Sequence, residues 1–300
     1  METISRSRKH AYLIIAHNNF EILKKQILMI DHIENDIYIH IDKKVKNFNF
    51  DYFKGLVKYS NVFFTKRIKV FWGHYSQIQC ELILLKKAIK NEYAHYHLLS
   101  GVDLPIKTQS YIHSFFEEHK DKEFIHIINN NWDNETNVYE KRIGKYYLFV
   151  KNYKSKYFFI KIASKLLDYI LVFIQNCLKI NRLNQTNIEY KFGANWFSIT
   201  HSFAEYVISQ ENWIKKTFSH SICGDEIFLQ TLLNNSNFRE NLVNKNMRLI
   251  DWERGVNSSP YTFKSEDFYE IINSDNLFAR KFDTNVDEKI IDKVFLNFFD

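Results

Sequence analysis

Glycine, proline and cysteine are scarce in this chain of 300 residues, which has seven glycines, two prolines and three cysteines. Neither G-x-G-x-x-G nor G-x-x-x-x-G-K-[ST] occurs, so the glycine-rich phosphate loops of Rossmann and P-loop proteins are excluded. The cysteines Cys80, Cys177 and Cys223 form no C-x-x-C pair. Their odd number and spacing indicate a reducing compartment and argue against structural zinc.

Long hydrophobic runs are also absent. The longest uncharged apolar stretch, Tyr169 to Leu178, is about half of the ~20 residues that a membrane span requires. The N-terminal METISRSRKHAYLIIAHNN has a basic start, but its apolar run is brief and no small-residue cleavage site follows, unlike a signal peptide. We therefore expect a cytoplasmic protein that is either free or attached peripherally to the inner face of the cell membrane.

The overall composition is that of a globular protein. Hydrophobic residues make up 45% of the chain and charged residues 25%, and 41 Lys and Arg against 35 Asp and Glu give a net charge of +6. This mild excess suits an anionic partner such as a nucleotide, whereas dispersed lysines argue against a nucleic-acid partner. Because no linker or internal repeat is visible, we predict a single domain over residues 1–300.

Strands and helices alternate in the first part of the chain. The apolar patterns predict strands at 10–17, 36–42, 61–65, 94–100 and 123–128, and helices at 20–30, 76–91 and 111–120. This alternation predicts an α/β fold with an open, mostly parallel sheet flanked by helices. We interpret residues 1–128 as a nucleotide-binding half. His17, Asp42 and Asp103 fall at the carboxyl ends of predicted strands, where such sheets bind ligands.

The pattern changes after residue 128. Residues 129–142 are polar and predicted as a loop, and residues 146–180 mix lysines with Phe, Tyr, Leu and Ile. We interpret residues 129–190 as a variable helical insertion. Its apolar part is either an interfacial helix that meets a membrane or a buried helical pair packed on the sheet.

Residues 191–300 return to mixed elements and are interpreted as the acceptor and catalytic half. Strands are predicted at 193–200 and 247–254, and helices at 203–210, 225–235 and 265–274.

No familiar catalytic constellation stands out from the residues alone. The chain has no nucleophile elbow, no H-E-x-x-H, no His/Cys metal cluster and no D-x-D, the acidic motif by which many nucleotide-sugar enzymes hold a cation. The charge of a nucleotide diphosphate must then be met by Lys and Arg. Arg280 and Lys281 are the foremost candidates, with Arg248 and Arg254 nearby in sequence. The alternative is a solvated surface pair, since charged residues are mostly exposed.

Three carboxylates have two interpretations each. Asp225 and Glu226 precede an apolar helical run, where they either stabilise a helix N-terminus or include a general base. Asp42 is either a turn residue or an acceptor of hydrogen bonds from a ribose or base.

The tryptophans Trp72, Trp196 and Trp252 are either core residues or sugar-stacking surfaces. His17 is likewise either a structural histidine or a ligand contact.

The order of the motifs narrows these alternatives. The chain reads HAYLIIAH, DIYIHIDKK, VFWGHYSQIQCELILLKKAI and HYHLLSGVDLPIKT, followed by GANWFSITHSFAEYV, GDEIFLQTLLNNS, RLIDWERG and LFARKFD. In sequence and order it resembles the core-2/I-branching enzyme family of glycosyltransferases, which includes the peptide O-xylosyltransferases. The resemblance covers nearly the whole chain apart from roughly residues 129 to 190.

The resemblance implies a glycosyltransferase-A type fold, a UDP-GlcNAc or UDP-xylose donor, inversion at the anomeric carbon and no divalent metal or other cofactor. It identifies Glu226 as the catalytic base and Arg280 with Lys281 as the basic pair at the donor diphosphate. His17 and Asp42 match positions around the nucleotide. Asp103 stands where other glycosyltransferases keep metal-binding carboxylates. We group the residues other than the base as donor-binding: His17, Asp42, Asp103, Arg280 and Lys281.

The acceptor side is less clearly matched. Trp252 corresponds to an acceptor-side aromatic of the branching enzymes. Those enzymes also carry an arginine upstream of the basic pair; the matching position is near Ser258, and Arg254 is the nearest substitute. We group Trp196, Trp252 and Arg254 as acceptor-binding.

We therefore predict an inverting, metal-independent glycosyltransferase that moves GlcNAc, or next xylose, from a UDP-sugar to a hydroxyl of a glycan. Animal members are disulfide-rich and membrane-anchored, and this chain shows neither feature. We therefore expect a bacterial relative that acts in surface polysaccharide synthesis, where acceptors are lipid-linked. The alternative is a non-catalytic nucleotide- or carbohydrate-binding protein on the same fold.

Overall fold

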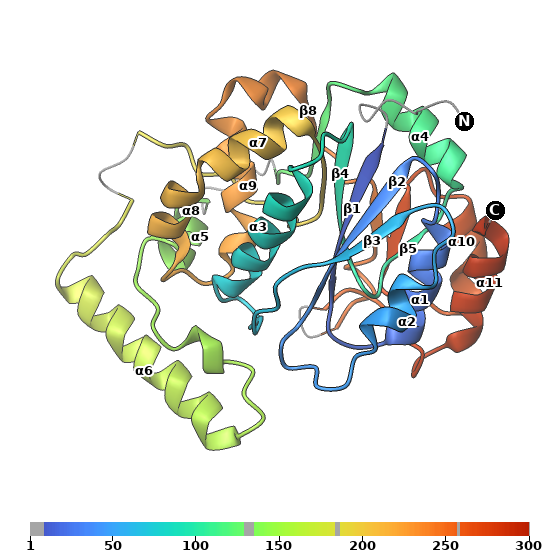
Figure 1. Cartoon of the computed structure of the whole chain (residues 1–300). Coiled ribbons are helices and arrows are strands. Elements are labelled where there is room, and N and C mark those ends of the chain that lie inside the picture. Colours follow the sequence, from blue (N-terminus) through green and yellow to red (C-terminus); the bar gives the residue numbers. More distant parts are fainter. Residues whose placement is uncertain (1–8, 129–134, 184–186, 257–258, 300) are drawn as a thin grey trace.

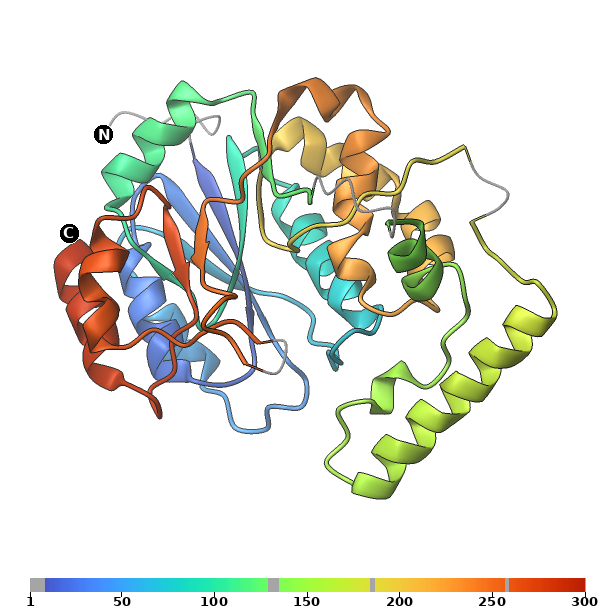
Figure 2. The same cartoon turned by 180° about the vertical axis from the view of Figure 1, so that it is seen from behind.

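The computed structural model describes residues 9–128, 135–183, 187–256 and 259–299. These residues form a seven-stranded sheet with helices on both faces and a second sheet of three short strands (Figures 1 and 2). The α/β fold with an open, mostly parallel sheet is therefore confirmed.

The large sheet has the order β3-β2-β1-β4-β7-β6-β8. Its strands are β1 (His10–Ala16), β2 (Asn35–Ile41), β3 (Asn61–Phe64), β4 (His95–Ser100), β6 (Glu123–Ile125), β7 (Phe197–Thr200) and β8 (Leu242–Val243). β7 runs antiparallel to its neighbours β4 and β6, and every other neighbouring pair is parallel. Strands from both the early and the late part of the chain thus share one sheet.

Helices cover both faces of this sheet, and α6 lies apart from them (Figures 1 and 2). They are α1 (Phe20–Met29), α2 (Phe50–Lys54), α3 (Ser76–Ala88), α4 (Gln109–Glu118), α5 (Glu135–Arg142), α6 (Phe158–Cys177), α7 (His201–Ser209), α8 (Glu211–Phe218), α9 (Phe228–Asn234), α10 (Phe268–Ile272) and α11 (Glu288–Phe298). Alternate residues of β1 serve the two layers because a strand has a period of two. Ala11 and Leu13 pack in the core that includes α3, α7 and α9, whereas Tyr12 and Ile14 pack in the core that includes α1 and α4.

The small sheet consists of β5 (Leu104–Pro105), β10 (Phe278–Arg280) and β9 (Arg248–Ile250), in the order β5-β10-β9. β10 pairs antiparallel with β5 and parallel with β9. Since β5 follows β4 almost directly, this sheet brings a late segment of the chain beside the carboxyl end of β4.

The loop predicted over residues 129–142 is wrong for its second part, which forms helix α5; residues 129–134 lie outside the described chain. The sequence of α5 has no apolar period, so pattern reasoning could not detect it. A tertiary contact holds its last residue, since Arg142 forms an ion pair with Glu226.

Helix α6 projects from the body of the molecule (Figures 1 and 2). Most of its large apolar side chains are exposed, and that of Phe159 is 84% accessible. The alternative of a buried helical pair packed on the sheet is therefore wrong. Within the described residues, no helix combines the length and apolar character needed to cross a bilayer.

Candidate active site

Three predicted donor-binding residues follow the carboxyl ends of adjacent strands. His17 follows β1, Asp42 follows β2 and Asp103 lies three residues beyond β4. Backbone hydrogen bonds hold these strand ends together, because the Asp42 N–H donates to the Ala16 carbonyl (3.0 Å) and the Gly101 N–H donates to the Ile15 carbonyl (2.9 Å). Gly101 is required at this junction, since a Cβ there would lie 2.7 Å from that of Ala16.

Asp42 is buried, and several donors hold its carboxylate. The backbone N–H groups of Lys44 and Val70 donate to Oδ1 (2.8 Å) and Oδ2 (3.3 Å) respectively. The Lys44 ammonium forms an ion pair with Oδ2 at 3.2 Å. Asp42 therefore orders the turn after β2, and its carboxylate retains lone pairs for a further donor such as a ribose hydroxyl.

His17 is exposed beside this turn. The surrounding protein desolvates the imidazole and lowers its pKa, and the attraction of Asp42 opposes this effect. The neutral ring, which offers one donor and one acceptor, is therefore favoured at neutral pH.

Arg280 lies between Asp103 and Trp196. Its Nε is 3.3 Å from Oδ1 of Asp103, and its guanidinium carbon is 4.1 Å from the centre of the Trp196 ring. Burial lowers the pKa of Arg280 and raises that of Asp103, and each charge partly offsets the effect on the other. Asp103 also accepts hydrogen bonds from the N–H (2.8 Å) and the hydroxyl (2.5 Å) of Ser100. Asp103 thus fixes Arg280 at the end of β4.

Lys281 follows directly in the chain. The Phe282 N–H donates to the Val102 carbonyl at 3.1 Å, so the segment containing Lys281 runs beside the segment that leads to Asp103. Its ammonium donates to the hydroxyl of Ser259 at 2.6 Å. Burial and the neighbouring Arg280 both lower the pKa of Lys281. Arg280 and Lys281 together place two positive charges beside the carboxyl ends of the strands.

Glu226 ends a short 3-10 turn (Gly224–Glu226) before α9. Its carboxylate forms an ion pair with Arg142, whose guanidinium also lies over the Phe192 ring, 4.6 Å from its centre. The Gly193 N–H donates to the Glu226 carbonyl at 2.9 Å. Arg142 therefore fixes the orientation of the side chain that the sequence identifies as the base.

One short segment joins Glu226 to the cations. Gly193 binds the backbone of Glu226, and Trp196, three residues further on, stacks on Arg280. Four residues span at most about 14 Å when fully extended. Glu226 and Arg280 are therefore linked through residues 193–196, which contact the Glu226 backbone at one end and the Arg280 guanidinium at the other.

The W-G-x-x-S turn before α3 (residues 72–76) contacts the residues that precede Glu226. The Cys223 N–H donates to the Gly73 carbonyl at 2.7 Å, and the Gln77 amide donates to Asp225 at 2.8 Å. Burial and the adjacent Glu226 raise the pKa of Asp225 to about 7. Asp225 is thus a buried packing residue, and Glu226 is the more accessible member of the acidic pair.

The residues grouped as acceptor-binding lie in different environments. Trp196 is buried with Arg280 beside its ring, whereas Trp252 is 58% exposed, two residues beyond the Ile250 that pairs with Arg280 in the small sheet. Arg254 forms ion pairs with three carboxylates, those of Asp251, Asp267 and Glu270. The position near Ser258 lies outside the described residues.

Arg248, near the basic pair in sequence, is buried and serves the fold. Its guanidinium donates to the carbonyls of Leu98 (3.1 Å) and Phe197 (2.6 Å) and to the Ser198 hydroxyl (3.0 Å), linking β4 to β7. Burial lowers its pKa to about 9.

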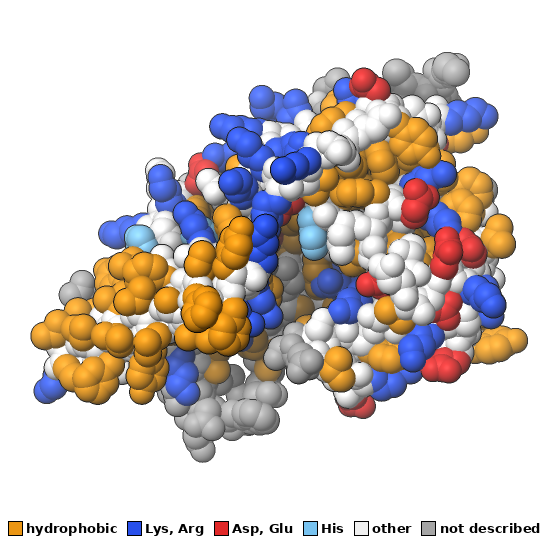
Figure 3. All heavy atoms as spheres, turned by 90° about the horizontal axis from the view of Figure 1, so that it is seen from below, with side chains coloured by type: hydrophobic (Ala, Val, Ile, Leu, Met, Phe, Trp, Pro, Cys, Tyr) orange, Lys and Arg blue, Asp and Glu red, His pale blue; other side chains and the backbone are white. Residues whose placement is uncertain are grey.

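The molecular surface is hollowed on this side. Figure 3 views the molecule from the side of the carboxyl ends of the parallel strands and shows a hollow with Lys and Arg side chains around it, next to the apolar surface of α6. An anionic ligand would meet a positive surface there.

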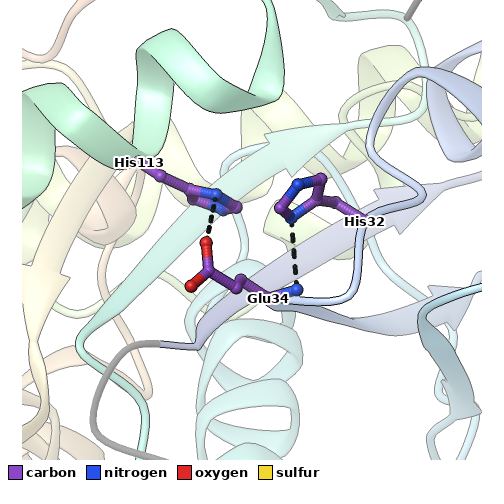
Figure 4. Close-up of side chains that lie close together, drawn as sticks. All are labelled: His32, Glu34 and His113. Atoms are coloured by element: carbon purple, nitrogen blue, oxygen red, sulfur yellow. Dashed lines mark hydrogen bonds and ion pairs between the residues drawn. The ribbon is translucent and has the colours of Figure 1, made fainter. Parts of the chain in front are cut away.

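A second cluster of chemistry-bearing residues lies at the opposite end of β2. His32, Glu34 and His113 each offer one ligand atom within 4.8 Å of the others (Figure 4). Nδ1 of His113 lies 3.1 Å from Oε2 of Glu34, and either a proton or a metal ion between them would complete this contact. The seven-residue strand β2 separates the cluster from Asp42 by roughly 20 Å, so these residues could hold a metal only away from the donor-binding positions.

Sequence reasoning did not identify Arg142, Lys44 or Gln77. Lys44 is two residues after Asp42 and was visible as part of the basic pair Lys43–Lys44. Arg142 and Gln77 carry no local signal, because their partners Glu226 and Asp225 are 84 and 148 residues distant.

The charged side chains described above gather at the carboxyl ends of parallel strands, the edge at which open α/β sheets bind their ligands. The model of the Core-2/I-branching enzyme family matches residues 10–277. The chain belongs to this glycosyltransferase family.

Its relatives include xylosyltransferases. Rat xylosyltransferase 2 is 24% identical over 310 residues, and human xylosyltransferase 2 is 23% identical over the same length. Each alignment covers 94% of this chain, which spans about a third (33%) of the relative's length. The apo crystal structure of mouse xyloside xylosyltransferase 1 matches over 90% of this chain and 96% of that one, with 10% identity and a TM-score of 0.37.

Proposed function

We propose that this glycosyltransferase moves a sugar from a UDP-sugar to a hydroxyl of a glycan, with inversion and without a divalent cation. UDP-GlcNAc is the first donor to consider from the sequence motifs, and UDP-xylose is supported by the names of the relatives. The observation that carries the proposal is the connection of Glu226 to the Arg280–Lys281 pair through residues 193–196.

The proposed reaction is a single in-line displacement. Glu226 accepts the proton of the acceptor hydroxyl, and the oxygen attacks the anomeric carbon from the face opposite the leaving group. The bond between that carbon and the diphosphate oxygen breaks, and its electron pair leaves with UDP. Arg142 orients the carboxylate, since it pairs with Glu226 in the structure.

Arg280 and Lys281 would stabilise the negative charge that develops on the departing diphosphate. Fixed cations at the site of developing charge supply one of the largest contributions to catalysis. Asp103 and Trp196 are proposed as positioning residues, because both contact Arg280. Asp42 and His17 are proposed to contact the nucleotide.

The experiment is a panel of UDP-sugars, assayed for donor hydrolysis and transfer in the presence of EDTA. We expect turnover with UDP-GlcNAc or UDP-xylose that chelation does not reduce. Glu226→Gln should lower kcat by about 10²–10⁴-fold, the usual contribution of a general base, and leave UDP affinity unchanged. The exposed Glu117→Gln on α4 is the matched control.

The outcomes separate the alternatives. Loss of activity on chelation would contradict the metal-independent mechanism, and near-wild-type turnover of Glu226→Gln would contradict the assignment of the base. UDP binding without turnover of any donor would favour the non-catalytic nucleotide-binding protein.

The acceptor is proposed to be a glycan of bacterial surface polysaccharide synthesis, carried on a lipid at the inner face of the cell membrane. The exposed apolar face of α6 supports a peripheral membrane location.

A further inference from the structure

Helix α6 carries an apolar surface that the rest of the described chain does not cover. Its exposed large side chains run along the whole helix. They are Phe158, Phe159, Ile160, Ile162, Leu166, Leu167, Tyr169, Ile170, Phe173 and Ile174. Monomeric proteins rarely expose contiguous apolar patches of this kind unless the patch binds a partner or a membrane.

The buried side chains of α6, in contrast, are polar: Ser164, Asp168 and Gln175. Asp168 is buried and accepts hydrogen bonds from the N–H groups of Leu148 (2.9 Å) and Phe149 (3.1 Å) and from the Tyr153 hydroxyl (2.9 Å). Gln175 is also buried and bonds the backbone of Tyr146 in both directions (2.8 and 3.0 Å). These hydrogen bonds attach the polar side of α6 to the segment before it. The apolar side chains on the opposite side of the helix therefore face the solvent.

The charge around this surface has one sign. Residues 145–180 contain lysines at 145, 151, 154, 156, 161, 165 and 179, and their one acidic residue is the buried Asp168. Each lysine near an anionic bilayer contributes roughly 1 kcal/mol of attraction. An apolar face bordered by lysines is complementary to an anionic lipid surface and less so to a second copy of this chain, which would bring like charges together.

We propose that α6 lies flat in the interface of an anionic bilayer, with its apolar side chains among the acyl chains and its lysines at the phosphate level. A 20-residue helix is about 30 Å long, enough to hold the protein at the surface without spanning it.

This docking also orients the molecule. The apolar surface of α6 and the hollow with its Lys and Arg side chains occupy the same face of the molecule (Figure 3). Seating α6 therefore turns the carboxyl edge of the sheet toward the lipid headgroups. This part of the inference rests on the proposed function, since it places the donor-binding edge where a lipid-linked acceptor would be presented.

The test is co-flotation with phosphatidylcholine vesicles with and without phosphatidylglycerol. We expect the full chain to float with the anionic vesicles and to be released by high salt or by omission of phosphatidylglycerol. The triple variant Phe159→Gln, Leu166→Gln, Phe173→Gln changes three exposed residues on one side of the helix and should lower the partition coefficient by at least about tenfold.

The matched control is Tyr269→Gln with Leu296→Gln, two apolar residues that are exposed elsewhere on the surface. It should float like the unmodified chain. Circular dichroism checks that each variant folds. Flotation requires no turnover, so failure here and failure of the proposed function are distinguishable.

Equal flotation of the triple variant and the unmodified chain would overturn the proposal. So would a dimer in light scattering that the triple variant converts to monomers, if the unmodified chain does not float, because α6 would then bind a second copy.

Discussion

Arg280 and Lys281 are adjacent cations in a position where both charges are disfavoured. Burial lowers the pKa of each, and the charge of Arg280 lowers that of Lys281 further. Asp103 offsets this effect for Arg280 directly. A bound diphosphate would stabilise both positive charges. Its binding is therefore more favourable because the folded protein alone does not fully compensate these charges.

Lys281→Ala should therefore weaken UDP binding measurably. Loss of a charged hydrogen bond costs about 1.5–3 kcal/mol, which is roughly a 10- to 100-fold rise in Kd. Isothermal titration calorimetry measures it directly, with the exposed Lys289→Ala on α11 as the control. An unchanged Kd would remove Lys281 from the donor site.

At the residue scale the sequence suggests single candidate positions but not their partners. The acidic pair before α9 and the F-A-R-K-F motif are local patterns, so Glu226, Arg280 and Lys281 could be proposed as candidates from the sequence and its family resemblance. The contacts of Arg280 with Asp103 and Trp196 depend on strands that pair across the chain, and no local pattern encodes them. The ion pairs that occupy Arg254 were equally unforeseeable.

Among the connecting segments, residues 193–196 matter most for the proposed active site. It contacts Glu226 at one end and Arg280 at the other. A Cβ at Gly193 would lie 1.8 Å from the His126 carbonyl oxygen. Glycine is therefore required where this segment passes the chain beyond β6.

Gly193→Ala should lower both stability and turnover. The segment must move to relieve the clash, at a cost of about 1–3 kcal/mol by analogy with overpacked sites, and the movement displaces Glu226 relative to Arg280. Urea denaturation and kcat measure the two effects. Gly55→Ala is the control, because its Cβ would meet atoms no closer than 3.4 Å. A variant that loses stability but retains full kcat would show that this segment does not position Glu226.

Elements with strong apolar patterns could be predicted from the sequence, whereas several of the shortest strands, which are recognisable only by their pairing, could not. β1, β2 and β4 are buried central strands, so their apolar runs are visible in the sequence. In the small sheet, β9 lies within the strand predicted at 247–254, whereas β5 and β10 have two or three residues, too few for a period to be recognised. For α6 the sequence predicted the helix and left two locations open, because an apolar face alone does not reveal what covers it.

Titratable side chains buried throughout the molecule couple its stability to pH. Desolvation by the surrounding protein lowers the pKa of eight histidines: His10, His17, His40, His74, His95, His97, His113 and His126. It raises the pKa of four carboxylic acids: Glu81, Asp103, Glu123 and Asp225. The first set destabilises the fold as pH falls below 6.5, and the second set opposes this effect over part of the same range.

The histidines outnumber the acids, so the free energy of unfolding should fall between pH 6.5 and 5. His40 alone, with a pKa near 4, lowers the free energy of unfolding by about 1.6 kcal/mol over this interval, since the unfolded chain binds the proton and the folded chain does not. Urea denaturation at both pH values tests this. His40→Asn should reduce the dependence of the unfolding free energy on pH. Equal stability at the two pH values would contradict the prediction.

The position of β7 has a consequence for biosynthesis. As the chain leaves the ribosome, β4 can pair with β1 at once. Its partner on the other side, β7, is synthesised roughly a hundred residues later. Until then one edge of the nascent sheet has unpaired backbone groups, a template for aggregation. Translation that pauses between these strands would prolong this exposure, and a chaperone that binds extended segments would have its greatest effect in the same interval.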